Sequence, residues 1–275
     1  MEPSNANEKA AHKLDSVREL GTRIDFGKTA GDYAKHRAGF PDAFFERLAK
    51  IDVITAGKKA LDLGTGTGTV ARGLATRGLE VTGLDKSIPL MEQAKQIDRE
   101  AGVSVRYIEA TAEATGLPSG AFDLVTAGQC WHWFVRDKAA AEVRRLLKPG
   151  GRLVIAHFDW IAIAGNVADA TEDLIRSYNS AWNLWGGTGM YPPWLRDMGA
   201  AGYRDIESFT FDIDAPYSHE AWRGRVRASA GVGAAMPPER VAQFDSELAA
   251  ILKDRFPEPM TVLHRVFVAI GVAPN

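Results

Sequence analysis

The segment that most constrains the fold is a glycine cluster placed directly after a short apolar run. The run is Lys59–Leu63, and the cluster that follows reads Gly64-Thr65-Gly66-Thr67-Gly68. Residues 69–77 then carry apolar side chains at helical spacing, and Gly78 ends them. Glycine permits positive φ angles and a close approach of ligand to backbone, while a following helix offers free N–H groups. The sequence therefore predicts a strand–turn–helix unit whose turn binds a ligand.

The same alternation continues along the chain. Further strands are expected at residues 80–84, 103–108, 122–127 and 152–158, with helices at 88–101 and 136–147. The residues Lys148 to Gly151 read as a stop and turn. Strands that alternate with helices at this spacing predict an α/β fold with a mostly parallel sheet covered on both faces.

After residue 159 the pattern changes to helical stretches that are interleaved with two more strands. Helices are expected at about 167–182 and over 218–254, a glycine-rich loop at 185–193, and strands at 206–213 and 261–270. We interpret the whole chain, 1–275, as one domain. It comprises an N-terminal cap (1–45), a cofactor-binding core (46–159), lid and substrate insertions (160–260), and a final strand with a tail (261–275).

Composition narrows the class of partner. The net charge is −2, so no basic excess points to nucleic acid. The single cysteine, Cys130, excludes an internal disulfide and a thiolate metal cluster, and the histidines lack metal-ligand spacing, so no metal site is expected. The polar N-terminus lacks the apolar core of a signal peptide, and no apolar run approaches the roughly 20 residues of a membrane span. We expect a cytoplasmic protein with a small-molecule partner and no membrane association.

The acidic residues around the glycine cluster separate two kinds of nucleoside ligand. Asp85 follows the second strand, where a carboxylate can bind ribose hydroxyls. Gly66, Gly68 and Ala71 also satisfy the permissive dinucleotide pattern, which alone is weak. Asp62, however, would repel a pyrophosphate and favour an α-ammonium group. This favours S-adenosylmethionine over a nicotinamide cofactor.

Five motifs in order resemble the class I S-adenosylmethionine-dependent methyltransferases, in the small-molecule branch of ubiquinone-biosynthesis and trans-aconitate enzymes. They are LDLGTGTG, EVTGLD, EATAEATGLP, FDLVTAGQCWHWF and LLKPGGRLVI, within residues 26–159. The resemblance implies a Rossmann-like, seven-stranded, mostly parallel sheet with an antiparallel last strand and helical lid insertions. It also implies S-adenosylmethionine as cofactor and S-adenosylhomocysteine as product.

The resemblance also implies roles for individual residues. Gly64, Thr65 and Gly66 should lie against the methionine portion, Asp85 should hold the ribose, and Gln129 should lie near the transferring methyl. Lys86 and Ser87 should border the adenine, as should Thr111, Ala112 and Glu113, although the family often has Asp at the position of Thr111. Tyr33 and Arg37 resemble an element that covers the cofactor.

The acceptor side is indicated by residue types alone. His132 lies at the carboxyl end of the fourth strand and can act as a base, or it can simply pack in the pocket wall. Trp133 and Trp185 either line the pocket or belong to ordinary core and lid packing. The stretch with Trp222, Arg223 and Arg227 either captures a carboxylate through its guanidinium groups or forms a solvated basic helix face. We predict methylation of a small molecule, with oxygen as the expected acceptor atom. An NAD-dependent oxidoreductase and a non-catalytic nucleotide or S-adenosylmethionine binder remain the alternatives, and the oligomeric state is open.

Overall fold

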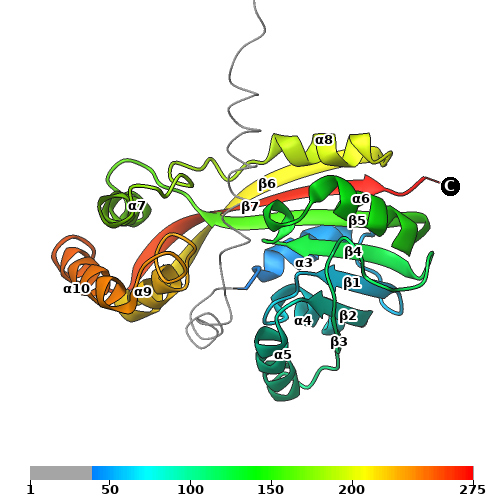
Figure 1. Cartoon of the computed structure of the whole chain (residues 1–275), viewed down its shortest axis with the longest axis horizontal. Coiled ribbons are helices and arrows are strands. Elements are labelled where there is room, and N and C mark those ends of the chain that lie inside the picture. The colour runs from blue at the N-terminus through cyan, green and yellow to red at the C-terminus, as the bar shows by residue number, and fades with distance from the viewer. Residues whose placement is uncertain (1–38, 275) are drawn as a thin grey trace, which may run out of the picture.

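A computed structural model describes residues 39–274 and contains a seven-stranded sheet with the order β3-β2-β1-β4-β5-β7-β6 (Figure 1). The strands β1 to β5 pair in parallel, whereas β7 runs antiparallel to both β5 and β6. The expected fold class is thereby confirmed. The strands are β1 (Lys59–Leu63), β2 (Glu80–Asp85), β3 (Arg106–Glu109), β4 (Phe122–Gly128), β5 (Leu147–Trp160), β6 (Arg204–Tyr217) and β7 (Met260–Val272).

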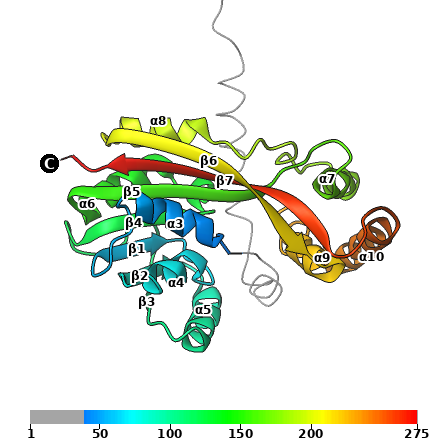
Figure 2. The same cartoon turned by 180° about the vertical axis from the view of Figure 1, so that it is seen from behind.

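Helices cover both faces of the sheet, as the apolar strands require. On one face α6 and α8 pack on a core that includes Trp131, Val143 and Trp194. On the other face α3 and α4 pack on a core that includes Phe44 and Leu74 (Figure 2). The helices are α3 (Asp42–Lys50), α4 (Thr69–Ala75), α5 (Ile88–Glu100), α6 (Arg136–Leu146), α7 (Val167–Tyr178), α8 (Pro192–Ala200), α9 (His219–Arg227) and α10 (Pro238–Arg255), with a short 3-10 turn, η2 (Trp131–Trp133).

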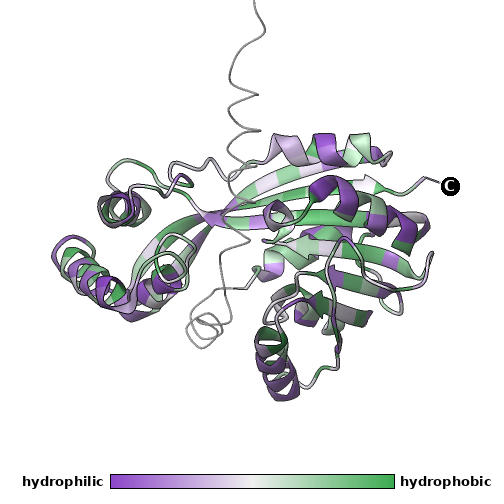
Figure 3. Ribbon diagram, in the orientation of Figure 1, coloured by the Kyte–Doolittle hydropathy of each residue, from purple (hydrophilic) through white to green (hydrophobic). Residues whose placement is uncertain are grey.

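The last three strands are much longer than the others and project beyond the main sheet. Their projecting ends carry a third apolar core, formed with α7, α9 and α10, in which Trp222 and Phe244 are fully buried. Figures 1 and 2 show these helices as a separate group at the far end of β6 and β7. In Figure 3 the strand residues between the helices are predominantly hydrophobic and the outer helix faces hydrophilic.

Most expected elements form close to their predicted places, and the differences have local causes. The helix α6 ends at Leu146, close to the expected residue 147, but the residues Lys148 to Gly151 do not form a separate turn between this helix and the next strand. They lie within β5, at a shift in register between the pairings of Phe122 and Leu124 on β4. The helix expected to reach residue 182 ends at Tyr178. Within residues 39–274 no helix is both long and apolar enough to cross a membrane.

Candidate active site

The glycine cluster forms a tight turn between β1 and α4. Gly64, Gly66 and Gly68 have φ angles of 58°, 54° and 76°, a region that L side chains rarely adopt. Asp85, at the end of β2, holds the turn because one of its oxygens accepts the Gly66 N–H at 2.8 Å and the other accepts the Ser87 N–H at 2.9 Å. Burial raises the pKa of Asp85 despite these hydrogen bonds. The carboxylate thus lies beside the turn, at the position expected for a ribose-binding residue.

Asp62 does not take the place that the sequence suggested. It is 1% exposed, and its two oxygens accept the hydroxyls of Thr65 and Thr126, each at 2.7 Å. Burial raises its pKa to about 6. The expectation that Asp62 faces an α-ammonium group is therefore wrong for this structure, because the side chain points inward and braces the turn and β4.

A second buried carboxylate braces the turn from its other side. Asp98 on α5 is 3% exposed, forms an ion pair with Arg72 at 2.7 Å and accepts the Tyr107 hydroxyl at 2.7 Å. Arg72 in turn donates to the carbonyl of Thr67 at 2.9 Å. This cluster was not predicted, although the arginine of α4 and the aspartate of α5 both lie inside predicted helices.

The turn leaves space for a ligand beside Gly66. Gly66 is buried, yet a Cβ built on it would meet no atom within 4 Å, whereas a Cβ on Gly68 would lie 2.4 Å from the Tyr107 hydroxyl. Open space beside a turn with positive φ angles, flanked by the carboxylate of Asp85, fits the amino-acid and ribose portions of S-adenosylmethionine.

The residues expected near an adenine ring are placed in different ways. Lys86 and Thr111 are exposed and Ser87 is half-buried beside Asp85, so they lie at the surface near the turn or the next strand end. Ala112 is 3% exposed within the apolar core, and the Glu113 carboxylate accepts the Val135 N–H at 2.8 Å. Glu113 therefore holds the start of α6. Tyr33 and Arg37 lie outside the described residues.

The segment 129–134 borders both the turn and a large cavity. On the turn side, Cys130 donates its thiol to the Leu63 carbonyl at 3.0 Å, and a Cβ on Gly64 would lie 2.8 Å from the Cys130 Cβ. On the cavity side, Gln129 (φ 60°) and His132 line the wall. A ligand in the turn and a ligand in the cavity would therefore both lie beside this segment, at the end of β4.

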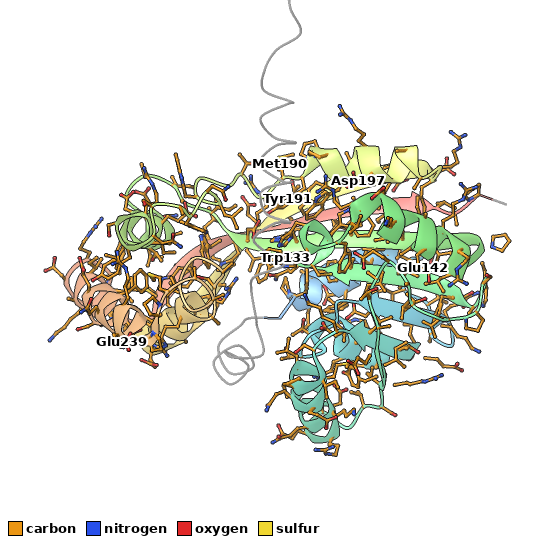
Figure 4. All side chains as sticks on the ribbon, in the orientation of Figure 1. Trp133, Glu142, Met190, Tyr191, Asp197 and Glu239 are labelled. Carbon is orange, nitrogen blue, oxygen red and sulfur yellow. The ribbon has the colours of Figure 1, made fainter. Side chains whose placement is uncertain are left out.

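The cavity has a volume of about 410 Å³ and lies between the main sheet and the group of α7 and α9. Aromatic side chains form much of its wall, and Figure 4 shows Trp133, Met190 and Tyr191 gathered at this junction. Such a volume suits a small molecule. The residues that line it are Gln129, His132, Trp133, His157, Asp159, Trp160, Glu172, Trp182, Leu184, Gly186 to Pro193, Arg225 and Ala228 to Gly231.

A hydrogen-bonded cluster lies in the cavity wall at the end of β5. His157 Nδ1 lies 2.8 Å from one oxygen of Asp159, and the Tyr191 hydroxyl donates to the other oxygen. The ring of His132 lies 5.2 Å from that of His157. Burial would raise the pKa of Asp159, but the charge and hydrogen bond of His157 and the hydroxyl of Tyr191 bring it below its usual value. Asp159 is therefore ionised at neutral pH.

The side of the cavity formed by α7 and α9 carries a second set of polar groups. Glu172 on α7 accepts the Trp160 indole N–H at 2.8 Å and the Gly186 N–H at 2.7 Å, and burial raises its pKa. The Arg225 guanidinium lies 5.0 Å from the centre of the Trp160 ring. Glu172 thus ties the glycine-rich loop to α7 at the edge of the cavity.

Several residues expected to bind the acceptor are placed elsewhere. Trp222 is fully buried in the third core, where its indole donates to Thr171, and Trp185 is 45% exposed beneath the Arg176 guanidinium. Arg223 and Arg227 form ion pairs with Asp245 and Glu220. The structure does not bring these four residues to the cavity, because burial and neighbouring carboxylates hold them. Trp133 and His132 do line it.

Several residues that line the cavity were not predicted from the sequence. His157 lies in a predicted strand without any spacing signal, and Asp159 directly follows that strand. Tyr191 comes from the glycine-rich loop, and Glu172 and Arg225 lie on helices whose inward faces depend on packing. The position of His157 and Asp159 at a strand's carboxyl end was the one signal that could have found them.

Comparison with known proteins agrees with this geometry. Residues 61–155 match the family model described as a methyltransferase domain. An uncharacterized methyltransferase of Mycobacterium bovis is 30% identical over 159 residues, which is 56% of this chain and 62% of that protein. A ubiquinone biosynthesis O-methyltransferase of Pseudomonas aeruginosa is 39% identical over 105 residues, which is 37% of this chain and 44% of that protein.

A solved structure shows the same fold over nearly the whole length. It is a putative type II methyltransferase from Anaeromyxobacter dehalogenans, with a TM-score of 0.59, 24% identity, and coverage of 87% of this chain and 99% of that chain. The chain spans 62% or less of the two curated relatives described above. Residues 61–155 thus form a methyltransferase domain, and the predicted resemblance to class I S-adenosylmethionine-dependent methyltransferases is confirmed.

Proposed function

We propose that this protein, with its methyltransferase domain, transfers a methyl group from S-adenosylmethionine to an oxygen atom of a small molecule. The observation that carries the proposal is the segment 129–134. It contacts the glycine turn on one side and lines a 410 Å³ cavity on the other. A cofactor in the turn and an acceptor in the cavity would be held in contact at one point, which methyl transfer requires.

The cofactor would be held by the turn and the adjoining strand ends. Gly64, Thr65 and Gly66 would lie against its methionine portion, Asp85 would bind its ribose, and Gln129 would lie near the methyl group. The sulfonium supplies the reactivity when S-adenosylmethionine is bound, so the protein contributes position and exclusion of water. Lys86, Ser87 and Thr111 would border the adenine.

The walls of the cavity favour a small and largely planar acceptor. Trp133, Trp160, Trp182 and Tyr191 supply flat apolar surface, and the loop 186–189 covers part of the cavity. The Pseudomonas relative is named as an O-methyltransferase, which supports oxygen as the acceptor atom. His132, in the same wall, remains a candidate for contact with the acceptor.

Incubation with methyl-labelled S-adenosylmethionine tests the proposal. The full chain is mixed with a panel of phenols, enols, carboxylic acids and amines, and mass spectrometry follows the labelled product and S-adenosylhomocysteine. We expect an O-methylated product in equimolar yield with S-adenosylhomocysteine. A product with the labelled methyl group on nitrogen would contradict oxygen as the acceptor atom. If the protein binds the cofactor but transfers no methyl group to any compound of the panel, it would instead be a non-catalytic binder.

A further inference from the structure

We propose that His157 is the general base for the acceptor, oriented by Asp159 and Tyr191, and that the acceptor is a planar hydroxyl compound such as a phenol or an enol. This inference rests on the proposed function, because it assigns the proton that an oxygen acceptor must lose. It replaces the sequence-based choice of His132 for the role of base.

The hydrogen-bond arrangement selects one nitrogen of His157. Nδ1 lies 2.8 Å from an Asp159 oxygen, so in the neutral ring the N–H sits on Nδ1 and donates to that carboxylate. The lone pair is then on Nε2, the ring nitrogen that is left for a substrate proton. Because His157 itself lines the cavity, a hydroxyl group of an occupant can reach it.

Asp159 is held in the charge state that this role needs. Its carboxylate accepts hydrogen bonds from both His157 and Tyr191, and such hydrogen bonds favour the ionised form of a buried carboxyl group. Burial and the adjacent Asp159 raise the pKa of Tyr191 well above its usual value, so its hydroxyl stays protonated and continues to donate. An ionised Asp159 stabilises the imidazolium that forms when His157 accepts a proton.

The geometry distinguishes His157 from His132. The ring of His132 stacks obliquely on Trp133 at 4.3 Å and lies 5.2 Å from the ring of His157. His157 Nδ1 lies 2.8 Å from the Asp159 carboxylate, which fixes the orientation of the His157 ring. The other charged groups that face the cavity are Glu172 on α7 and Arg225 on α9, and both lie against Trp160.

The same charges favour a hydroxyl acceptor over a carboxylic acid. A carboxylate is already ionised at neutral pH and needs no base, and it would face the negative charge of Asp159. A phenol or enol needs its proton removed as it reacts. The acceptor oxygen forms a bond to the methyl carbon while the carbon–sulfur bond breaks, sulfur keeps that electron pair, and the hydroxyl proton passes to Nε2 of His157 and then to solvent.

The test uses 4-nitrophenol, because its phenolate absorbs visible light and reports its own ionisation. The full chain, saturated with S-adenosylhomocysteine, is titrated with 4-nitrophenol over a range of pH. Transfer of the proton to a base within contact distance should lower the apparent pKa of the bound phenol by about one to three pH units. The variant His157→Gln should lose this shift, and Asp159→Asn should reduce it. The variant His219→Gln, at a histidine of α9 outside the cavity, should retain it.

Calorimetric binding of S-adenosylhomocysteine by each variant is the control for folding and for the proposed function. If no form binds S-adenosylhomocysteine, the proposed function fails and this inference falls with it. If all forms bind it but wild-type protein shows no bound phenolate, or His157→Gln keeps the full shift, the inference alone is overturned. Preferential binding of 4-nitrobenzoate over 4-nitrophenol would also overturn it.

Discussion

Replacing Asp98 with alanine should damage both stability and cofactor binding, although Asp98 lies on α5 behind the glycine turn. The carboxylate is 3% exposed and holds Arg72 and Tyr107 at 2.7 Å each. Its loss leaves the guanidinium of Arg72, whose side chain is 16% exposed, without its ion pair. The carbonyls of Thr67 and Ala94 would still accept hydrogen bonds from that group.

The expected loss of stability is large. Removing one partner of a buried ion pair costs about 3–5 kcal/mol. A domain of ordinary stability has about 5–15 kcal/mol in total. Arg72 also holds the backbone of the turn through Thr67. If one residue of the turn becomes mobile without this support, it must be ordered again when the ligand binds. That ordering costs about 1–2 kcal/mol, which corresponds to roughly a tenfold loss of S-adenosylhomocysteine affinity.

Urea unfolding and calorimetry measure the two effects. The matched control is Asp173→Ala, which removes an exposed ion pair of Asp173 with Arg176 and should cost about 1 kcal/mol or less. A double-mutant cycle of Asp98→Ala with Arg72→Met isolates the energy of the pair. If Asp98→Ala loses no more stability than the control and binds S-adenosylhomocysteine normally, the bracing role of Asp98 is refuted.

Three further predictions concern the turn and α9. The raised pKa of Asp62, about 6 against 3.8, means that its charging destabilises the fold by about 3 kcal/mol as pH rises from about 3 to 7. Asp62→Asn should lose this slope in urea titrations, and an unchanged slope would contradict the assignment. Gly64→Ala should lower the melting temperature because its Cβ would lie 2.8 Å from that of Cys130, whereas Gly66→Ala should fold but bind S-adenosylhomocysteine poorly. Equal melting temperatures and equal affinities of the two variants would rule out a cofactor site beside Gly66. Arg227→Met should lose about 1–2 kcal/mol of stability because its ion pair with Asp245 is removed, while its affinity for S-adenosylhomocysteine stays unchanged. An altered affinity would show that Arg227 contributes to the binding site.

The first half of the fold could be predicted because its signals are local. The run Lys59–Leu63 and the glycines after it specify a buried strand and a turn without reference to the rest of the chain. The place of Asp85 follows from its position at a strand end, and the structure puts it against Gly66. Asp62 was misplaced because the sequence cannot tell whether a carboxylate at a strand end points outward or toward neighbouring hydroxyls.

The acceptor side could be predicted less well because it depends on packing between distant segments. Arg223 and Arg227 are one helical turn apart and share the face of α9 that meets Asp245 on α10, whereas Arg225 points to the cavity. That choice of face is set by the third core and by the length of β6 and β7. Trp185 was expected in the pocket from its neighbouring glycines, yet the loop turns it outward against Arg176.

The most direct test of the central assignment is calorimetric titration of the full chain with S-adenosylmethionine, S-adenosylhomocysteine and NAD, repeated with Asp85→Ala. We predict binding of the first two ligands and none of NAD, with the variant weakened by about 1.5–3 kcal/mol through lost charge-assisted hydrogen bonds. Binding of NAD alone, or an affinity for S-adenosylhomocysteine that Asp85→Ala leaves unchanged, would contradict the assignment of the glycine turn as the S-adenosylmethionine site.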